Sequence, residues 1–316
     1  MFFSSSSKWQ EGSAWDRYFQ LYDEVATDQF QNISYYESKL VPTSFGDIQV
    51  HLCGDPTYPP IVLFHGIGSC SLMFGDWILS ELSRKYYCIA LDTIGDLGKS
   101  KPKDGDLSNG PKTEEEMADW AVQVIDAVLR TDTQVNLVGY SMGSFIASCV
   151  ARYRPHRVKK VILTCPAGTV APIRLPWLLK AIWTGILSTL APSMGDYLRL
   201  SFVKYMMVDP DNNMKHLKRI EFLQAAGDLG MSKVNIQPRQ LELEQLQKMN
   251  EACPTLLIIG QQETVIDADA AINMAEKAGL GVKVYENAGH MMYCEPPARD
   301  TVARDIDKFM TTCRTE

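Results

Sequence analysis

Short apolar runs alternate with amphipathic stretches along most of this 316-residue chain, and this alternation restricts its fold more than any other feature. The runs are typical of strands that are buried on both faces of a sheet, because such strands carry no polar side. Strands that alternate with helices pack as right-handed βαβ units. The sequence therefore predicts an α/β protein whose mostly parallel sheet is flanked by helices. The predicted strands are Ile61–Phe64, Tyr86–Leu91, Val135–Val138, Val158–Thr164, Thr255–Gly260 and Val282–Glu286.

Helical spacing of apolar residues predicts the elements between these strands. Residues 114–129 form the best-defined case, because Thr113 is placed to cap the helix and Glu116 has the spacing of a capping box. An antiparallel hairpin over residues 38–54, with its turn near Gly46, precedes the first parallel strand. Further helices are expected over residues 14–30, 142–153, 268–278 and 299–310.

One long segment interrupts the alternation. Residues 168–249 contain no strand-like run and separate two predicted core strands. We therefore expect a single domain with its core at about 31–167 and 250–316, a helical lid inserted at 168–249, and an N-terminal helical extension over 1–30. Residues 172–192 are the most apolar part of the insertion. At least half of their surface is expected to pack on the core, with the remainder available to line an apolar pocket.

Composition excludes several classes of function. The net charge is −7 and no cluster of five or more Lys and Arg occurs, which argues against a nucleic-acid partner. Eight cysteines lack CxxC pairs and zinc-site spacing, so we expect reduced thiols and no metal. The longest apolar stretch is too short to span a bilayer, so no integral membrane segment is expected. These features favour a cytoplasmic setting, although the short Ser-rich N-terminus leaves organelle targeting open.

The sharpest motif is Gly139-Tyr140-Ser141-Met142-Gly143, which lies between a predicted strand and a predicted helix. A sharp strand-to-helix turn crowds the backbone, and glycines two residues from the serine allow the close approach. The turn raises the Ser141 hydroxyl above the sheet and directs a helix N-terminus at it. The motif in this context predicts a nucleophilic serine.

A second motif, His65-Gly66-Ile67-Gly68, directly follows the first parallel strand. With the serine motif, it makes the chain resemble the α/β-hydrolase fold superfamily. The resemblance implies that the backbone N–H groups of Ile67 and Met142 form an oxyanion hole and that His65 is structural. The loop Asp92–Ser100 resembles a tight loop of that family, with one extra residue between its glycines, and favours a carboxylesterase-like branch. We assign that loop no catalytic role.

The resemblance also implies the partners of the serine. Of the five histidines, His290 lies in a Gly-flanked loop after the last strand, where the family places its catalytic base. The family places the acid three residues after the glycine that ends the preceding strand, and here that residue is Glu263. Asp267 is the alternative acid, although its position is that of a helix N-cap.

These residues predict a serine hydrolase that cleaves a carboxylic ester or a similar acyl bond through an acyl-enzyme. The expected partner is a small, hydrophobic ester, and no metal or organic cofactor is needed. Thioesterase, lactonase, amidase and carbon–carbon hydrolase activities use the same serine and stay open. The alternative from another class is a small-molecule receptor of this fold with slow or incidental hydrolysis. The sequence does not indicate an oligomeric state.

Overall fold

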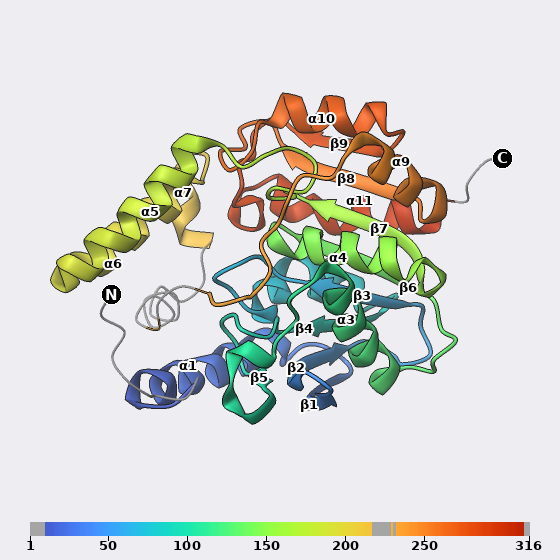
Figure 1. Ribbon diagram of the computed structural model, residues 1–316, viewed down its shortest axis with the longest axis horizontal. Helices are drawn as coiled ribbons and strands as arrows, with labels where there is room; N and C mark the ends of the chain where they lie inside the picture. Colours follow the sequence, from blue (N-terminus) through green and yellow to red (C-terminus); the bar gives the residue numbers. More distant parts are fainter. Residues whose placement is uncertain (1–9, 217–228, 230–231, 313–316) are drawn as a thin grey trace.

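A twisted sheet with helices on both faces forms the body of the protein (Figure 1). The computed structural model describes residues 10–216, 229 and 232–312. Strand order along the sheet is β1-β2-β4-β3-β6-β7-β8-β9, and β5 pairs with β2 beside this path. All neighbours from β4 to β9 are parallel, whereas β1, β2 and β5 add antiparallel pairs. The α/β class and the mostly parallel sheet are therefore confirmed.

The strands extend over Tyr36–Thr43 (β1), Gly46–Cys53 (β2), Pro60–Phe64 (β3), Tyr87–Leu91 (β4), Lys101–Pro102 (β5), Val135–Tyr140 (β6), Val158–Thr164 (β7), Thr255–Gly260 (β8) and Gly281–Tyr285 (β9). The helices that surround the sheet are α1 (Ser13–Phe30), α2 (Ser80–Leu82), α3 (Glu114–Val128), α4 (Met142–Tyr153), α9 (Leu243–Ala252), α10 (Ala268–Lys277) and α11 (Ala298–Thr311). Thr113 caps α3 by accepting a hydrogen bond from the Glu116 N–H, as the sequence predicts.

Two hydrophobic layers hold these helices to the sheet. One layer combines α3, α4, α9 and α10 with side chains of one sheet face, and Trp120 and Phe145 are its largest fully buried members. The other layer joins α1 and α11 to the opposite face, with Tyr18 and Phe74 at its centre. All parallel strands except the edge strand β9 are almost entirely buried, which explains their continuous apolar runs.

Buried hydrogen bonds attach the N-terminal helix to the sheet. Tyr22 on α1 donates its hydroxyl to Asp92 Oδ2 at 2.8 Å, and the same hydroxyl lies 2.7 Å from His51 Nε2. The other ring nitrogen of His51 contacts the Tyr36 hydroxyl at 2.8 Å. Burial lowers the pKa of His51 to about 4, so this histidine is a neutral hydrogen-bonding group at physiological pH. The first nine residues of the predicted extension lie outside the described residues.

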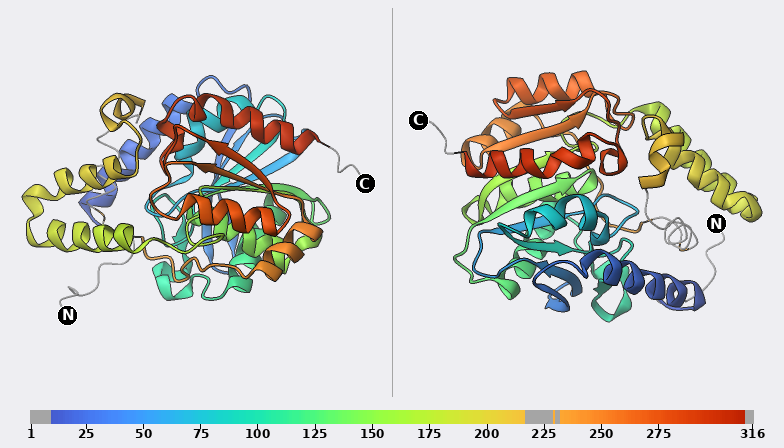
Figure 2. Two further views of the ribbon diagram at one scale, coloured as in Figure 1. Left: turned by 90° about the horizontal axis from the view of Figure 1, so that it is seen from above. Right: turned by 180° about the vertical axis from the view of Figure 1, so that it is seen from behind.

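The insertion between β7 and β8 is helical and comprises α5 (Leu175–Leu190), α6 (Gly195–Tyr205) and α7 (Pro210–Asn213). We call α5 and α6 together the helical arm, because they form a hairpin that extends away from the body in each view (Figures 1 and 2). The expectation that at least half of the apolar surface over residues 172–192 packs on the core is wrong for α5. None of its residues is buried; Trp177 is half-buried against the core, whereas the other large apolar side chains of α5 are exposed. Residues 217–228 and 230–231 of the predicted lid lie outside the described residues.

Two further sequence predictions concern membranes and cysteines. Within the described ranges, no helix combines the length and the apolar character that crossing a bilayer requires. Seven of the eight cysteines lie in the described part of the chain, and all seven are free and buried. Cys313 lies outside it.

Candidate active site

Ser141 occupies the sharp turn between β6 and α4. Its backbone lies at φ 53° and ψ −117°, a conformation that a non-glycine residue adopts only under strain. A Cβ at position 143 would lie 1.9 Å from the Phe64 carbonyl oxygen, and one at position 139 would lie 2.4 Å from Ser144 Cα. Both glycines of the motif are therefore required by close packing of the turn against β3 and α4. The turn is the strained strand-to-helix geometry that the sequence predicts.

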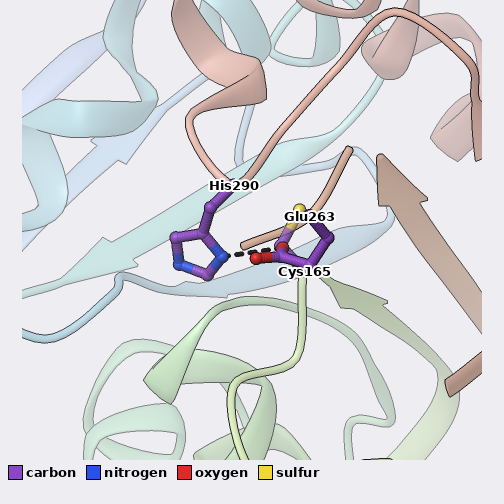
Figure 3. Close-up of side chains that lie close together, drawn as sticks. All are labelled: Cys165, Glu263 and His290. Carbon is purple, nitrogen blue, oxygen red and sulfur yellow. Dashed lines mark hydrogen bonds and ion pairs between the residues drawn. The ribbon is translucent and has the colours of Figure 1, made fainter. Parts of the chain in front are cut away.

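His290 reaches the serine from the loop after β9. Its Nε2 lies 3.0 Å from Ser141 Oγ, and its Nδ1 lies 2.8 Å from Glu263 Oε2. Figure 3 shows the Glu263 carboxylate directed at the ring of His290. Because a carboxylate accepts and does not donate, Nδ1 carries the ring proton and Nε2 is left to accept the serine hydroxyl. The structure thus brings together three residues that are 122 and 27 positions apart in sequence order.

Glu263 is fixed by the turn that follows β8. Its second oxygen, Oε1, accepts the Val265 N–H at 2.7 Å, so both carboxylate oxygens have a partner. The side chain is fully buried, which shields its hydrogen bond with His290 from solvent. Asp267 is placed differently: it is exposed and caps α10 by accepting the Ala270 N–H at 2.9 Å. Among the two acids that the sequence offers, Glu263 contacts the histidine.

The loop after β3 closes the other side of the serine. A Cβ at Gly66 would lie 3.2 Å from Ser141 Cβ, so this loop packs directly on the turn. His65 is a structural residue here: its Nε2 accepts the Thr93 N–H at 2.8 Å and its Nδ1 bonds the Gly66 carbonyl oxygen. The N–H groups of Ile67 and Met142 have no acceptor among the residues that the structure describes. Two backbone donors are therefore available beside the serine.

Asp96, to which the sequence analysis assigns no role, holds the same loop from behind. Its carboxylate accepts the Gly68 N–H at 3.0 Å and the Leu97 N–H at 2.8 Å. Burial raises the pKa of Asp96 to about 7, although these two N–H donors oppose the shift. The sequence shows only that Asp96 lies in the Asp92–Ser100 loop, which has one extra residue between its glycines. The spacing does not show which backbone groups a carboxylate meets.

Aromatic side chains hold the histidine loop in place. Tyr140, the residue before the serine, donates its hydroxyl to the carbonyl oxygen of His290. Its ring packs edge-on against Trp77 and Tyr293 at centroid distances of 6.1 and 5.6 Å. Burial raises the pKa of Tyr140 well above its usual value, so the hydroxyl keeps its proton and stays a donor. Tyr140, the first variable residue of the G-x-S-x-G pattern, thus positions the loop that carries His290.

Glu295 connects the histidine loop to the end of the helical arm. Its Oε2 accepts the Gly289 N–H at 2.7 Å, and its Oε1 accepts the Val208 N–H at 2.6 Å. A backbone bond from the Met291 N–H to the Met206 carbonyl oxygen, at 3.3 Å, runs beside these two. Glu295 is fully buried, and burial raises its pKa. The arm is therefore exposed along its length but bonded to the active-site loop at its base.

Cys165, Glu263 and His290 form the one group in the described part of the chain whose ligand atoms are close enough to hold a metal ion. Figure 3 shows the Cys165 thiol beside the Glu263 carboxylate. Metal binding requires a thiolate, but burial raises the pKa of Cys165 well above its usual value. The His290 nitrogen and the Glu263 oxygen already bond each other at 2.8 Å. The donor set therefore fits a hydrogen-bonded chain better than a metal site.

Comparisons with known proteins agree with this geometry. The alpha/beta hydrolase fold family matches residues 59–297. A Bacillus subtilis protein described as an uncharacterized carboxylesterase, nap, is 27% identical over 294 residues, which cover 89% of this chain and 88% of the relative. The mouse monoacylglycerol lipase ABHD6 is 25% identical over 271 residues, covering 82% of this chain and 77% of that protein.

A solved structure extends the match to three dimensions. The crystal structure of naproxen esterase from Bacillus subtilis, also called carboxylesterase NP, superimposes with a TM-score of 0.80 at 26% sequence identity. The alignment covers 95% of this chain and 99% of the esterase. The matched family spans the serine, the acid and the histidine described above. This chain belongs to the α/β-hydrolase fold family.

Proposed function

We propose that this protein is a serine hydrolase that cleaves a carboxylic ester, or a similar acyl bond, of a small hydrophobic substrate through an acyl-enzyme. The observation that carries the proposal is the unbroken line of hydrogen bonds from Ser141 Oγ through His290 to Glu263. A hydroxyl is a weak nucleophile until a base accepts its proton, and this line supplies the base and orients it. Carboxylesterase and lipase relatives indicate the same class, a hydrolase acting on ester bonds.

In the first step, Ser141 Oγ attacks the substrate carbonyl carbon while His290 Nε2 accepts its proton. Glu263 stabilises the resulting imidazolium through Nδ1–H. The tetrahedral intermediate then collapses: the bond to the leaving alkoxide breaks, and His290 donates its proton to the departing alcohol. The products of this step are the alcohol and an ester of Ser141.

In the second step, His290 Nε2 takes a proton from water, and the hydroxide attacks the acyl carbon. The second tetrahedral intermediate breaks its bond to Ser141 Oγ, which regains the proton from His290. The acid leaves and the enzyme returns to its starting state. In both steps the oxygen of the carbonyl gains negative charge, and the N–H groups of Ile67 and Met142 are the donors that stabilise it.

The helical insertion over residues 168–249 acts as the lid of this site. Its contact with the histidine loop through Glu295 supports that role, because it joins the insertion to the loop that carries His290. The monoacylglycerol lipase among the relatives supports an apolar substrate. Medium-chain esters are therefore expected to turn over faster than acetate.

The test is ester turnover by the wild type, Ser141→Ala and a matched control, Ser148→Ala, on p-nitrophenyl esters of increasing chain length. Ser148 lies on the same helix, is equally buried and bonds only the Phe145 carbonyl oxygen in the described chain. Loss of the nucleophile is expected to lower kcat by roughly 10³-fold or more, whereas the control keeps wild-type turnover.

Two outcomes contradict the proposal in different ways. If Ser141→Ala retains the wild-type rate, the serine is not the nucleophile. If the wild type barely turns over any ester, thioester or lactone, a small-molecule receptor of this fold becomes the better interpretation. Equal rates on acetate and medium-chain esters contradict the apolar substrate preference alone.

A further inference from the structure

Helix α5 carries a continuous apolar stripe that faces away from the protein. Its large apolar residues recur at intervals of three, four and one, which places them on one side of the helix. Their side chains are between 41% and 76% exposed, with Leu190 the most exposed and Trp183 at 57%. The stripe consists of Leu175, Leu178, Leu179, Ile182, Trp183, Ile186, Leu187 and Leu190.

The opposite side of α5 packs on α6. This side carries smaller or polar residues that are half-buried, including Ala181, Thr184 and Ser188. Trp177 lies on the same side of α5 as Ala181 and Ser188. Its ring contacts that of Phe202 on α6 at a centroid distance of 5.6 Å. An amphipathic helix on a globular protein normally buries its apolar stripe. In α5 the opposite side packs inward, so the described part of the chain leaves the apolar stripe uncovered.

The charge of the arm is opposite to that of the whole protein. Residues 174–205 contain four cations, Arg174, Lys180, Arg199 and Lys204, against the single carboxylate of Asp196. Arg199 is paired with Asp196, and Lys204 with Asp211 beyond this range, so the positive charge at the stripe comes from Arg174 and Lys180. Within 163–195 there is no acidic residue at all, although the net charge of the chain is −7. Arg174 and Lys180 are exposed, so part of this positive charge is presented beside the stripe. An anionic surface would attract this arm and repel the rest of the molecule.

We propose that the helical arm binds a lipid surface that contains anionic head groups, with α5 lying in the plane of the surface. Helices that bind in this way pair an apolar stripe with flanking cations, and aromatic residues favour the interfacial layer. Trp183 and Tyr197, 57% and 69% exposed, are the aromatic residues that enter it. At 16 residues, α5 is too short to span a bilayer and is long enough to lie on one.

A second copy of the chain is the other occupant that an apolar stripe suggests, and charge argues against it. Paired helices use charged residues beside the apolar seam to set partner and orientation. The only charged residue within α5 is Lys180, and its ammonium group lies 4.1 Å from the centre of the Tyr205 ring on α6. A lipid surface requires no matched pairs of charged residues, because it has no fixed alignment with the helix.

The proposal adds a location to the proposed function. The arm is bonded at its base to the histidine loop through Glu295, so a surface bound along α5 is connected through the arm to the loop that carries His290. Hydrophobic esters concentrate in such surfaces. The role of the surface as a source of ester substrates rests on the proposed function. Binding of the arm to lipid does not.

The experiment is flotation of the full-length Ser141→Ala protein with vesicles of phosphatidylcholine and phosphatidylglycerol, so that no ester is consumed. The inactive protein is expected to float with the vesicles. Replacing Leu179, Trp183 and Ile186 together by Ser is expected to weaken binding by about tenfold or more, because three side chains lose their apolar contact with the lipid. A matched control replaces Leu40 and Tyr58 by Ser. These two side chains are 48% and 40% exposed on the body. The control is expected to keep vesicle binding and, when Ser141 is left unchanged, ester turnover.

Tryptophan fluorescence gives a second reading of the same contact. Trp183 is the exposed tryptophan of the described chain, since Trp15, Trp77 and Trp120 are buried and Trp177 is half-buried. Vesicles are expected to shift its emission to the blue, and Trp183→Phe is expected to abolish the shift. Circular dichroism of every variant checks that the fold is intact.

The outcomes separate the alternatives. Absence of flotation, or equal flotation of the triple variant, overturns the proposal. A wild-type dimer that the triple variant dissociates, with no vesicle binding, assigns the stripe to a second copy instead. Vesicle binding by a protein that hydrolyses no ester would leave this inference standing and overturn the proposed function.

Discussion

Helices α4 and α5 are both rich in apolar residues, but the protein uses them in opposite ways. Ten of the twelve residues of α4 are buried between the sheet and its neighbouring helices, whereas none of the sixteen residues of α5 is buried. Burial of apolar surface is the main favourable contribution to folding, so α4 contributes to stability and α5 contributes little. Burial within the described part of the chain therefore does not account for the exposed apolar residues of α5.

The two regions also differ in how strictly geometry limits their residues. In the body, Gly143 has no room for a Cβ, and the hydrogen bonds around Glu263 use both carboxylate oxygens. Along the arm, side chains meet solvent, and many replacements fit. Changes in the body are thus expected to alter activity and stability, and changes on the outer side of the arm to alter binding only.

The largest effect is expected at Glu263. Glu263→Gln keeps the size of the side chain but replaces the negatively charged carboxylate by a neutral amide, which stabilises the imidazolium of His290 far less. We expect kcat to fall by about 10³- to 10⁴-fold, as for the loss of the equivalent charge in other serine hydrolases. Steady-state ester kinetics measure it. Asp267→Asn is the control, because its helix cap survives and its turnover should stay within about twofold of the wild type. A larger loss at Asp267 than at Glu263 would reverse the assignment.

The next effect concerns the pH dependence of stability and comes from Asp96. Burial raises the pKa of this carboxyl to about 7 in the folded protein, from an ordinary value of 3.8. The folded state therefore holds its proton more tightly than the unfolded state, and Asp96 reduces stability progressively as the pH rises from about 4 to about 7, with an upper bound of about 4 kcal/mol.

Asp96→Asn tests this expectation, because an amide oxygen in place of Oδ1 keeps the bonds from Gly68 and Leu97. The stability of the variant relative to the wild type should increase between pH 4 and pH 7, the window that the pKa shift defines. Denaturant unfolding at the two pH values measures the difference. A constant difference at both would show that Asp96 does not change protonation on unfolding.

Glu295 bonds both regions, the histidine loop of the body and the base of the arm. A substitution there tests whether the arm affects catalysis. Glu295→Gln leaves one oxygen for two N–H groups, those of Gly289 and Val208, so one buried donor loses its acceptor. If the base of the arm positions the histidine loop, kcat should fall by about tenfold with little change in KM. Asp300→Asn, at an exposed acid of α11, is the matched control. A variant that is less stable but has wild-type kcat would make Glu295 purely structural.

Much of the body could be predicted from the sequence, because buried parallel strands and a strained serine turn leave strong local patterns. The six parallel strands and the Ser141 turn followed from apolar runs, glycines and their order, and His290 followed from the resemblance to the α/β-hydrolase family. Strand β5 did not, since two residues give no period. The roles of Asp96 and Glu295 depend on which distant N–H groups face a carboxylate, and one residue in a loop carries no sign of that.

The arm illustrates a different limit. The sequence indicates an apolar segment over residues 172–192 of a helical insertion, but apolar composition does not reveal what covers each side of the helix. The expectation of packing on the core rests on the usual behaviour of soluble proteins. It fails here because the smaller side of α5 packs on α6 and leaves the larger side outward.

The smallest effect is expected at the end of the arm, where Leu190 is 76% exposed. Leu190→Ala should change the free energy of unfolding by no more than about 0.5 kcal/mol, because a side chain already in water loses no buried contact. Leu137→Ala is the matched substitution in the body: Leu137 is fully buried in β6, four residues before the serine, and its loss should cost about 2–5 kcal/mol. Urea unfolding of the two variants beside the wild type measures both values. A cost at Leu190 that approaches the cost at Leu137 would mean that the stripe is covered in solution by the protein itself, and the arm would then belong to the core and not to a surface that binds lipid.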